Sequence, residues 1–164
     1  MANITLKGKA ITTSGNLPQV GTIAPEFTLT GTDLSDVKLS DLKGKKVLNI
    51  FPSLDTGVCA MSVRTFAKQA AGKPGVTVLN ISADLPFAHK RFCTAENITG
   101  VTNLSSFRSD FAEKYGLKIA ESGMRGLNSR AVIVLDDANK VLYTEQVPEI
   151  TQEPNYEAAL AKVS

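Results

Sequence analysis

Residues 131–135 read Ala-Val-Ile-Val-Leu, and their apolar character at every position limits the folds open to this chain. A strand that faces water on one side alternates apolar and polar residues, so an unbroken apolar strand predicts cover on both faces. Two more short apolar runs, 47–51 and 76–81, are also predicted to be strands, and Pro52 ends the first of them. We therefore expect a central sheet with other layers packed against it.

Segments whose apolar residues have helical spacing lie between these strands and after them. The expected helices are 58–71, 86–97, 108–115 and 153–163. The first should end at Gly72, with Pro74 just beyond, and the third at Gly116. Alternating strands and helices predict parallel strands joined by crossovers, whereas the turn at 136–140 predicts that 141–147 pairs antiparallel to 131–135.

This order of elements is typical of an α/β fold, the thioredoxin-like sandwich, with a central mixed sheet flanked by helices. Residues 4–12 are expected to add an N-terminal β-hairpin around Gly8, and 26–30 with 37–39 a second short pair. The chain has 164 residues and is 43% hydrophobic, which is enough for one domain with a real core. We expect residues 1–164 to form that single domain.

Charge and composition argue against several functions. The net charge is +2 and no run of Lys or Arg occurs, so neither nucleic acid nor a charged membrane surface is an expected partner. Lys7, Gly8 and Lys9 interrupt the N-terminal segment, which therefore lacks the apolar core of a secretory signal. No stretch approaches the roughly 18 apolar residues of a membrane span. A cytoplasmic location is the expectation.

The chain contains two cysteines and one histidine. This set predicts no metal site, because structural zinc prefers four Cys or His ligands in close pairs. No organic cofactor is expected either. In a reducing compartment, a transient catalytic disulfide is favoured over a purely structural one.

Cys59 follows a strand that ends at Phe51, and Asp55 and Thr56 are good N-cap residues for the helix that begins near Val58. The cysteine should therefore lie in the first helical turn, where free N–H groups and the helix dipole favour a thiolate. It shares the apolar helix face and should lie at the rim of the core, in a shallow pocket. The alternative is a cysteine that acts only as a small hydrophobic residue.

The spacing Pro52-x-x-x-Thr56-x-x-Cys59 resembles the active-site motif of the peroxiredoxins, and PSLDTGVC resembles their thiol peroxidase branch. The family fold is thioredoxin-like, in agreement with the element order. By this resemblance, Cys59 is the peroxidatic cysteine that attacks the hydroperoxide. Thr56 is the hydroxyl that binds the peroxide and the thiolate, and Pro52 shields the sulfur.

Cys93 belongs to a helix that Asp84 should cap and Pro86 should start. Leu85, Ala88, Phe92 and Ala95 are expected to form its buried stripe, leaving Cys93 half exposed one step away. By spacing alone it is an inert boundary cysteine or a reactive one.

The segment SADLPFAxxRFC also resembles the thiol peroxidase branch, in which its cysteine is the resolving one. The resemblance thus implies a Cys59–Cys93 disulfide within one chain, as in the atypical two-Cys peroxiredoxins. A disulfide needs Cα atoms about 4.4–6.8 Å apart, which cysteines on separate packed helices rarely satisfy. We therefore expect the first turn around Cys59 to unwind before the bond forms.

Arg130 precedes the apolar strand 131–135, which should run antiparallel to strand 47–51 and so begin beside Cys59. A buried guanidinium needs an anion, either a carboxylate or the Cys59 thiolate. The Gly126-Leu127-x-x-Arg130 context resembles that of the peroxiredoxin active-site arginine. Arg108 is expected near the pocket or a dimer surface. His89 is expected to be a solvated helix residue, with a Cys–His pair as the alternative.

The resemblance implies reduction of hydrogen peroxide and alkyl hydroperoxides to water and alcohols, recycling by thioredoxin, and a homodimer. A general thiol–disulfide oxidoreductase would be expected to carry C-x-x-C, which the chain lacks. A redox sensor that changes shape through the disulfide, and a static structural disulfide, stay open as alternatives. Catalytic turnover of hydroperoxide distinguishes a peroxidase from a general oxidoreductase and from a redox sensor. Unfolding by dithiols identifies a static structural disulfide.

Overall fold

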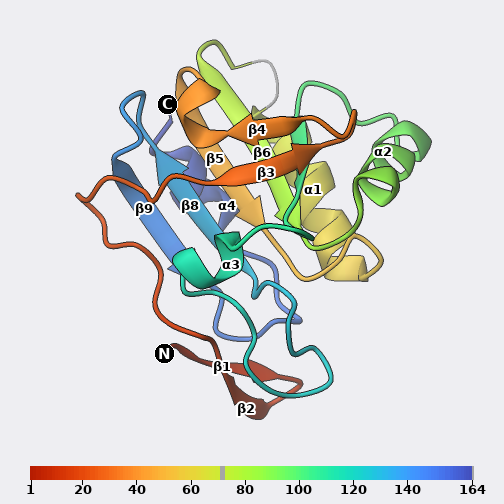
Figure 1. Cartoon of the computed structure of the whole chain (residues 1–164), viewed down its shortest axis with the longest axis vertical. Helices are drawn as coiled ribbons and strands as arrows, with labels where there is room; N and C mark the ends of the chain where they lie inside the picture. Colours follow the sequence, from red (N-terminus) through yellow and green to blue (C-terminus); the bar gives the residue numbers. More distant parts are fainter. Residues whose placement is uncertain (71–72, 164) are drawn as a thin grey trace.

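The computed structural model describes residues 1–70 and 73–163 and contains one large mixed β-sheet. Seven strands form it (Figure 1), in the spatial order β4 (Asp36–Lys38), β3 (Thr28–Gly31), β7 (Thr102–Ser105), β6 (Val76–Ser82), β5 (Lys45–Ile50), β8 (Ala131–Leu135) and β9 (Val141–Gln146). The parallel strands β5, β6 and β7 form its middle, and β8 pairs antiparallel with β5. The predicted thioredoxin-like sheet and its closing hairpin are confirmed.

Strand β7 was not anticipated from the sequence. Its residues Thr-Asn-Leu-Ser include a single strongly apolar side chain, so neither an apolar run nor a clean alternation marks it. It forms a strand because β6 and β3 offer backbone partners on its two sides.

The two faces of the sheet bury different layers. Helices α1 (Gly57–Ala70), α2 (Pro86–Ala95) and α4 (Tyr156–Leu160) pack against one face, on strands β5 to β8. The other face of the sheet, which carries Leu48 and Ile50, packs against Phe27 and the short helix α3 (Phe111–Lys114). Phe111 of α3 and Tyr115, which follows it, belong to this cluster. A single turn of 3-10 helix, Leu39–Asp41, follows β4. Both cysteine-bearing helices therefore cover the same face.

The helix boundaries differ modestly from the expectations. Helices α2, α3 and α4 are shorter than the predicted segments 86–97, 108–115 and 153–163. The expected end of α1 at Ala71 and Gly72 lies outside the described residues. Within 1–70 and 73–163, no helix is long and apolar enough to cross a membrane.

The N-terminal hairpin consists of β1 (Asn3–Leu6) and β2 (Lys9–Thr12), which form a separate two-stranded sheet (Figure 1). Glu149 fastens it to the chain before α4 by accepting hydrogen bonds from Gly8 N at 2.8 Å and Thr5 Oγ1 at 3.0 Å. Backbone hydrogen bonds from Thr151 and Gly8 lower the pKa of Glu149 to about 2, so the carboxylate stays charged at neutral pH. The hairpin is thereby held beside residues 149–151, the segment before α4 that also borders the candidate active site.

Candidate active site

Thr56 caps helix α1 and fixes the position of Cys59. Its Oγ1 accepts a hydrogen bond from Cys59 N at 3.4 Å, and its carbonyl oxygen accepts one from Ala60 N at 3.0 Å. A side chain that accepts from the third helical N–H is the usual N-cap arrangement. Cys59 therefore lies in the first turn of α1, as predicted.

The Cys59 side chain is fully buried, with 0% of its surface exposed. It packs with Phe51, Leu54 and Val63 in a small apolar cluster between the end of β5 and α1. Val63, Phe66 and Ala70 are buried on the same helix face, as predicted, but the Cys59 side chain is enclosed and does not lie in a shallow pocket at the rim of the core.

Arg130 reaches the sulfur from the neighbouring strand. Its Nη2 donates to Cys59 Sγ at 3.1 Å, and its Nε donates to the Ile150 carbonyl oxygen at 2.9 Å. The register explains the approach, since Ala131 at the start of β8 pairs with Ile50 at the end of β5. The guanidinium is 1% exposed, and no carboxylate partner is found for it in the described part of the chain.

A buried cation beside a sulfur has a clear electrostatic consequence. A guanidinium is always charged and can only donate, so the Cys59 sulfur accepts a charge-assisted hydrogen bond. Arg130 Nη1 is buried and has no hydrogen-bond partner among residues 1–70 and 73–163. One donor of the group is therefore still unused.

A pocket of about 300 Å³ lies next to this arrangement; Thr56 and Arg130, which contact Cys59, line it, whereas the enclosed Cys59 side chain does not. Its walls come from the N-terminal hairpin, the start of α1, the loop before β8 and the chain before α4: Leu6, Lys7, Pro52, Thr56, Gly57, Val58, Met124, Arg130, Ile150 and Thr151. Pro52, Thr56 and Arg130 were expected at the site from the sequence, and the structure brings them together beside Cys59. The walls from the hairpin, Met124 and 150–151 carry no sequence signal, because they become neighbours only through the fold.

Cys93 lies elsewhere, on the inner side of α2. It is 9% exposed and borders a second pocket of about 320 Å³ together with Lys90 and Asn103. Asn103 Nδ2 donates to its sulfur at 3.1 Å. Burial raises the pKa of the Cys93 thiol above its ordinary value, while the hydrogen bond from Asn103 acts in the opposite direction. Both cysteines are free thiols.

The predicted orientation of α2 was wrong. Its buried residues are Pro86, His89 and Cys93, whereas Leu85 is 50% exposed and Ala95 is exposed. The helix is rotated relative to the expected stripe, because a network of polar groups under its first turn holds His89 inward. Cys93, expected to be half exposed, is consequently buried.

That polar network links the start of α2 to the segment before Cys59. Asp84 was predicted to cap α2, but no side chain caps this helix. Its carboxylate instead accepts hydrogen bonds from Ser53 Oγ and Leu54 N, both at 2.8 Å, and from Ser82 Oγ at 2.6 Å. The loop that precedes Cys59 is thus tied to the segment that leads into α2.

His89 is fully buried, and the expectation of a solvated residue was wrong. Its Nε2 lies 3.0 Å from Ser82 Oγ, which already donates its proton to Asp84, so Nε2 is the donor in that pair. It also packs against Phe51, with 6.4 Å between ring centroids. Among the described residues, no hydrogen bond joins His89 to the sulfur of Cys59 or Cys93, so the structure does not support a Cys–His pair.

Acid should destabilise the fold through His89. Burial lowers its pKa from 6.5 to about 4, against the opposing charge of Asp84. Between these pH values the unfolded chain binds a proton that the folded chain does not. The free energy of unfolding should therefore fall by about 3 kcal/mol as pH decreases through this range.

Urea unfolding at pH 7 and pH 4 tests this pH dependence. The variant His89→Gln keeps a donor in this position without a titrating ring, so its loss of stability toward acid should be smaller. Equal losses in the two proteins would contradict the role assigned to His89.

Arg108 is not part of the pocket over Cys59. Its guanidinium donates to Thr30 Oγ1 at 3.1 Å and pairs with Asp36 at 3.3 Å, on strands β3 and β4. It also lies over the Phe107 ring, 5.4 Å from the centroid. The expectation that Arg108 lies near the pocket was wrong, and its place at a dimer surface stays a prediction.

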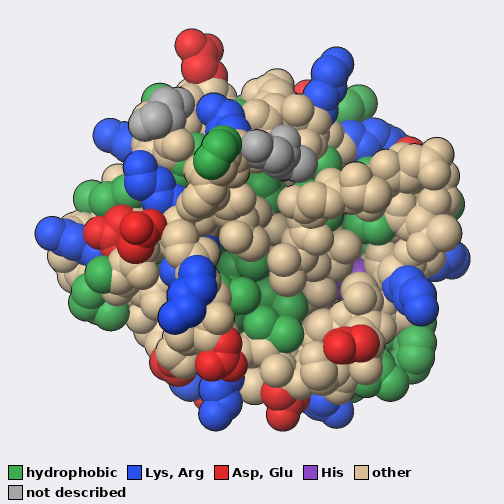
Figure 2. All heavy atoms as spheres, turned by 90° about the horizontal axis from the view of Figure 1, so that it is seen from above, with side chains coloured by type: hydrophobic (Ala, Val, Ile, Leu, Met, Phe, Trp, Pro, Cys, Tyr) green, Lys and Arg blue, Asp and Glu red, His purple; other side chains and the backbone are tan. Residues whose placement is uncertain are grey.

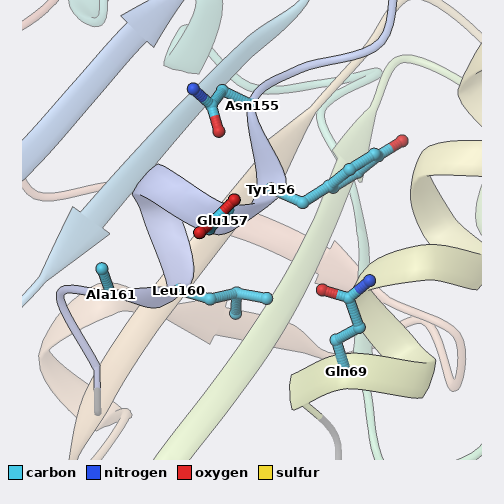
Figure 3. A pocket seen from close by; sticks show the side chains of 6 residues that line it. All are labelled: Gln69, Asn155, Tyr156, Glu157, Leu160 and Ala161. Carbon is cyan, nitrogen blue, oxygen red and sulfur yellow. The ribbon is translucent and has the colours of Figure 1, made fainter.

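The rest of the surface carries no second cluster of reactive side chains in the described part of the chain. A larger, open hollow of about 740 Å³ lies between the end of α1 and α4 (Figure 3), and it is lined by Gln69, Asn155, Tyr156, Glu157, Leu160 and Ala161, with no cysteine. On the face seen in Figure 2, basic and acidic side chains are interspersed over the surface. In the described part of the chain, no group of three or more His, Cys, Asp and Glu residues could hold a metal ion.

Comparison with known proteins places the chain in a family. The redoxin family model matches residues 19–160. A thiol peroxidase of Mycobacterium bovis is 58% identical over 162 residues, which cover 98% of both chains. A thiol peroxidase of Corynebacterium glutamicum is 52% identical and covers 100% of both chains. The crystal structure of a peroxiredoxin-like protein from Aquifex aeolicus has a TM-score of 0.93 at 41% identity, covering 99% of this chain and 96% of that one.

The chain belongs to the redoxin family. Within that family it is a peroxiredoxin of the thiol peroxidase branch, an oxidoreductase that acts on peroxides.

Proposed function

We propose that Cys59 reduces hydroperoxides in the pocket bordered by Pro52, Thr56 and Arg130. The thiolate attacks the terminal peroxide oxygen: an S–O bond forms, the O–O bond breaks, and the leaving oxygen takes a proton to become water or an alcohol. Cys59 is left as a sulfenic acid. The observation that carries this proposal is the Arg130 guanidinium 3.1 Å from a buried sulfur at a helix start.

The unused donor of Arg130 supports a second role in the same step. Negative charge moves from the sulfur to the leaving oxygen, and fixed donors at that position lower the barrier. Arg130 lines the pocket and its Nη1 is free to bind a peroxide oxygen. The Thr56 hydroxyl, also in the wall, donates to the Ser53 carbonyl oxygen at 3.3 Å, and in this proposal it turns its proton to the bound peroxide.

The pocket walls favour an organic substituent on the peroxide. Leu6, Met124 and Ile150 present apolar side chains, and Pro52 closes the side next to the helix start. Such walls release water when an alkyl group enters, which adds hydrophobic binding energy. Alkyl hydroperoxides are therefore the proposed better substrates, with hydrogen peroxide also accepted.

Cys93 is the proposed resolving residue. Its thiolate attacks the sulfenic sulfur of Cys59, so that an S–S bond forms while the S–O bond breaks and hydroxide leaves. Each sulfur starts buried in its own surroundings, Cys59 with Phe51 and Cys93 beside Asn103. A disulfide needs Cα atoms within about 7 Å, so the first turn of α1 is proposed to unwind during this step.

Thioredoxin is the proposed reductant of the Cys59–Cys93 disulfide, because an external dithiol is needed to complete the cycle by exchange. A homodimer and a cytoplasmic location complete the proposal. The family resemblance implies the homodimer, and a transient catalytic disulfide fits the reducing compartment of the cytoplasm. Sedimentation at several protein concentrations tests the dimer.

Replacing Cys93 by Ser should separate the two halves of the cycle. Cys59 should still consume one equivalent of hydroperoxide at close to the normal rate, because Arg130 and Thr56 are untouched. Turnover with thioredoxin and its reductase should then fall by more than about tenfold, because the sulfenic acid has no resolving partner in the chain.

Peroxide consumption and thiol counting after each turnover provide the measurement for this variant. Full turnover in Cys93→Ser would exclude the intrachain disulfide. Unfolding of the oxidised wild-type protein by a dithiol would indicate a static structural bond instead.

A further inference from the structure

A row of three asparagines crosses the sheet beneath the two cysteine-bearing helices. Asn49 on β5, Asn80 on β6 and Asn103 on β7 are direct neighbours in the parallel register. Asn49 and Asn80 are fully buried, and Asn103 is half-buried at the edge of the second pocket. We call these three residues the asparagine ladder.

Hydrogen bonds run through the asparagine ladder in one direction. Asn49 Nδ2 donates to Asn80 Oδ1, and Asn80 Nδ2 donates to Asn103 Oδ1, each at 3.1 Å. Asn103 Nδ2 then donates to Cys93 Sγ at 3.1 Å. The amide dipoles are aligned, with their positive ends toward the sulfur, and aligned hydrogen bonds strengthen one another.

The other end of the ladder reaches the first cysteine through Ser62. Asn49 Nδ2 also donates to Ser62 Oγ at 3.3 Å, and this hydroxyl donates to the carbonyl oxygen of Cys59 at 2.8 Å. The resolving sulfur is thereby connected to the helical turn of Cys59 by a continuous chain of side-chain hydrogen bonds.

The asparagine ladder is not explained by the stability of the fold, because apolar residues at these positions would stabilise it at least as well. The flanking residues Val47 and Val78, on the same face of the same strands, pack into an apolar cluster. Asn49 Oδ1 is buried without a partner in the described part of the chain. An unsatisfied buried amide oxygen costs about 1–3 kcal/mol, so apolar residues here would pack at least as well.

In the proposed cycle, these amides can assist the ionisation of Cys93. Cys93 must become a thiolate before it attacks the Cys59 sulfenic acid, and burial opposes that ionisation. Lys90 is the charged side chain that borders its pocket; β7 and residues 97–99 contribute no titratable group to the described wall. The Asn103 amide is the polar group in direct contact with the sulfur.

We propose, on the basis of the peroxidase cycle above, that Asn103 stabilises the Cys93 thiolate as it attacks the sulfenic sulfur. Asn80 and Asn49 are positioning residues that hold the Asn103 amide with its donor toward Cys93. The S–S bond forms as the S–O bond breaks, and the hydroxide that leaves takes up a proton to become water.

Two substitutions at one position test this role. Asn103→Asp keeps the shape and the acceptor for Asn80, but an ionised carboxylate cannot donate to sulfur and repels a thiolate. Asn103→Ala removes the donor without adding charge. Disulfide formation should slow about tenfold in Asn103→Ala and more in Asn103→Asp, with its pH midpoint moved to higher pH in both.

Stopped-flow measurements with one equivalent of hydroperoxide from pH 5 to 9 separate the steps. Oxidation of Cys59 should keep its rate, since Asn103 does not touch that sulfur. The control Thr94→Ala changes an exposed wall residue of the same pocket and should leave both steps unchanged. Unchanged or faster disulfide formation in the Asn103 variants, or equal slowing in Thr94→Ala, would overturn the proposal.

A second measurement does not depend on the resolving step. In a Cys59→Ser background Cys93 is the remaining cysteine, and its alkylation by iodoacetamide reports the thiolate directly. Adding Asn103→Ala should move the pH midpoint of alkylation upward, and an unmoved midpoint would refute the role of Asn103. If wild-type protein itself fails to form the disulfide after peroxide, the peroxidase cycle fails instead.

Discussion

Replacing Cys59 by Ser is expected to lower hydroperoxide turnover by more than about 1000-fold. A serine hydroxyl fits the buried site and keeps the helix cap at Thr56, but it does not ionise beside Arg130 at neutral pH. Since it cannot form the S–O bond, no sulfenic acid arises and Cys93 has nothing to attack. Consumption of cumene hydroperoxide, coupled to thioredoxin and its reductase, measures the loss.

The matched control for this variant is Cys93→Ser, which removes a sulfur of similar burial from the second helix. It should retain a single round of peroxide consumption, whereas Cys59→Ser should retain none. Circular dichroism checks that both variants keep the fold. Substantial turnover in Cys59→Ser would contradict the assignment of the nucleophile.

Replacing Arg130 by Met is expected to slow the oxidation of Cys59 by about 100-fold. Methionine has a similar reach and suits a site that is 1% exposed, so packing is largely preserved. The change removes the charge beside the sulfur, the free Nη1 donor and the hydrogen bond to Ile150. Single-turnover oxidation at neutral pH measures the effect before resolution begins.

Arg64→Met provides the control, because Arg64 lies on the same helix as Cys59 but forms an exposed pair with Glu96. Its oxidation rate should match that of the wild type. Arg130→Lys restores the charge without the planar fork and should fall between the two. An unchanged rate in a folded Arg130→Met protein would remove the guanidinium from the chemistry.

The sequence was most informative where local pattern and topology agreed. Unbroken apolar strands predicted a covered sheet, and the antiparallel relation of β8 to β5 predicted that Arg130 lies near Cys59. Asp55 and Thr56 were both cap candidates, because Ser, Thr, Asp and Asn accept from helix-start N–H groups, and the structure shows that Thr56 is the cap.

Other features depend on contacts that no local pattern carries. Strand β7 exists because its neighbours bond to it, and α2 is rotated because His89 joins a buried network with Ser82 and Asp84. The walls of the pocket come from four separate segments.

A sequence pattern does indicate part of the asparagine ladder. The tetrapeptide Val-Leu-Asn-Ile occurs at both 47–50 and 78–81, and the parallel register sets the two copies side by side. An asparagine at the same place in two apolar strands indicates a paired amide, although its connection to Cys93 through Asn103 requires the fold.

Mass spectrometry under non-reducing conditions, after one equivalent of hydroperoxide, tests the central claim most directly. The chain should lose its two free thiols together, and proteolysis should yield a linked pair of peptides that contain Cys59 and Cys93 from the same chain. Retention of both thiols beside unreacted peroxide, or oxidation of Cys93 while Cys59 stays free, would contradict it.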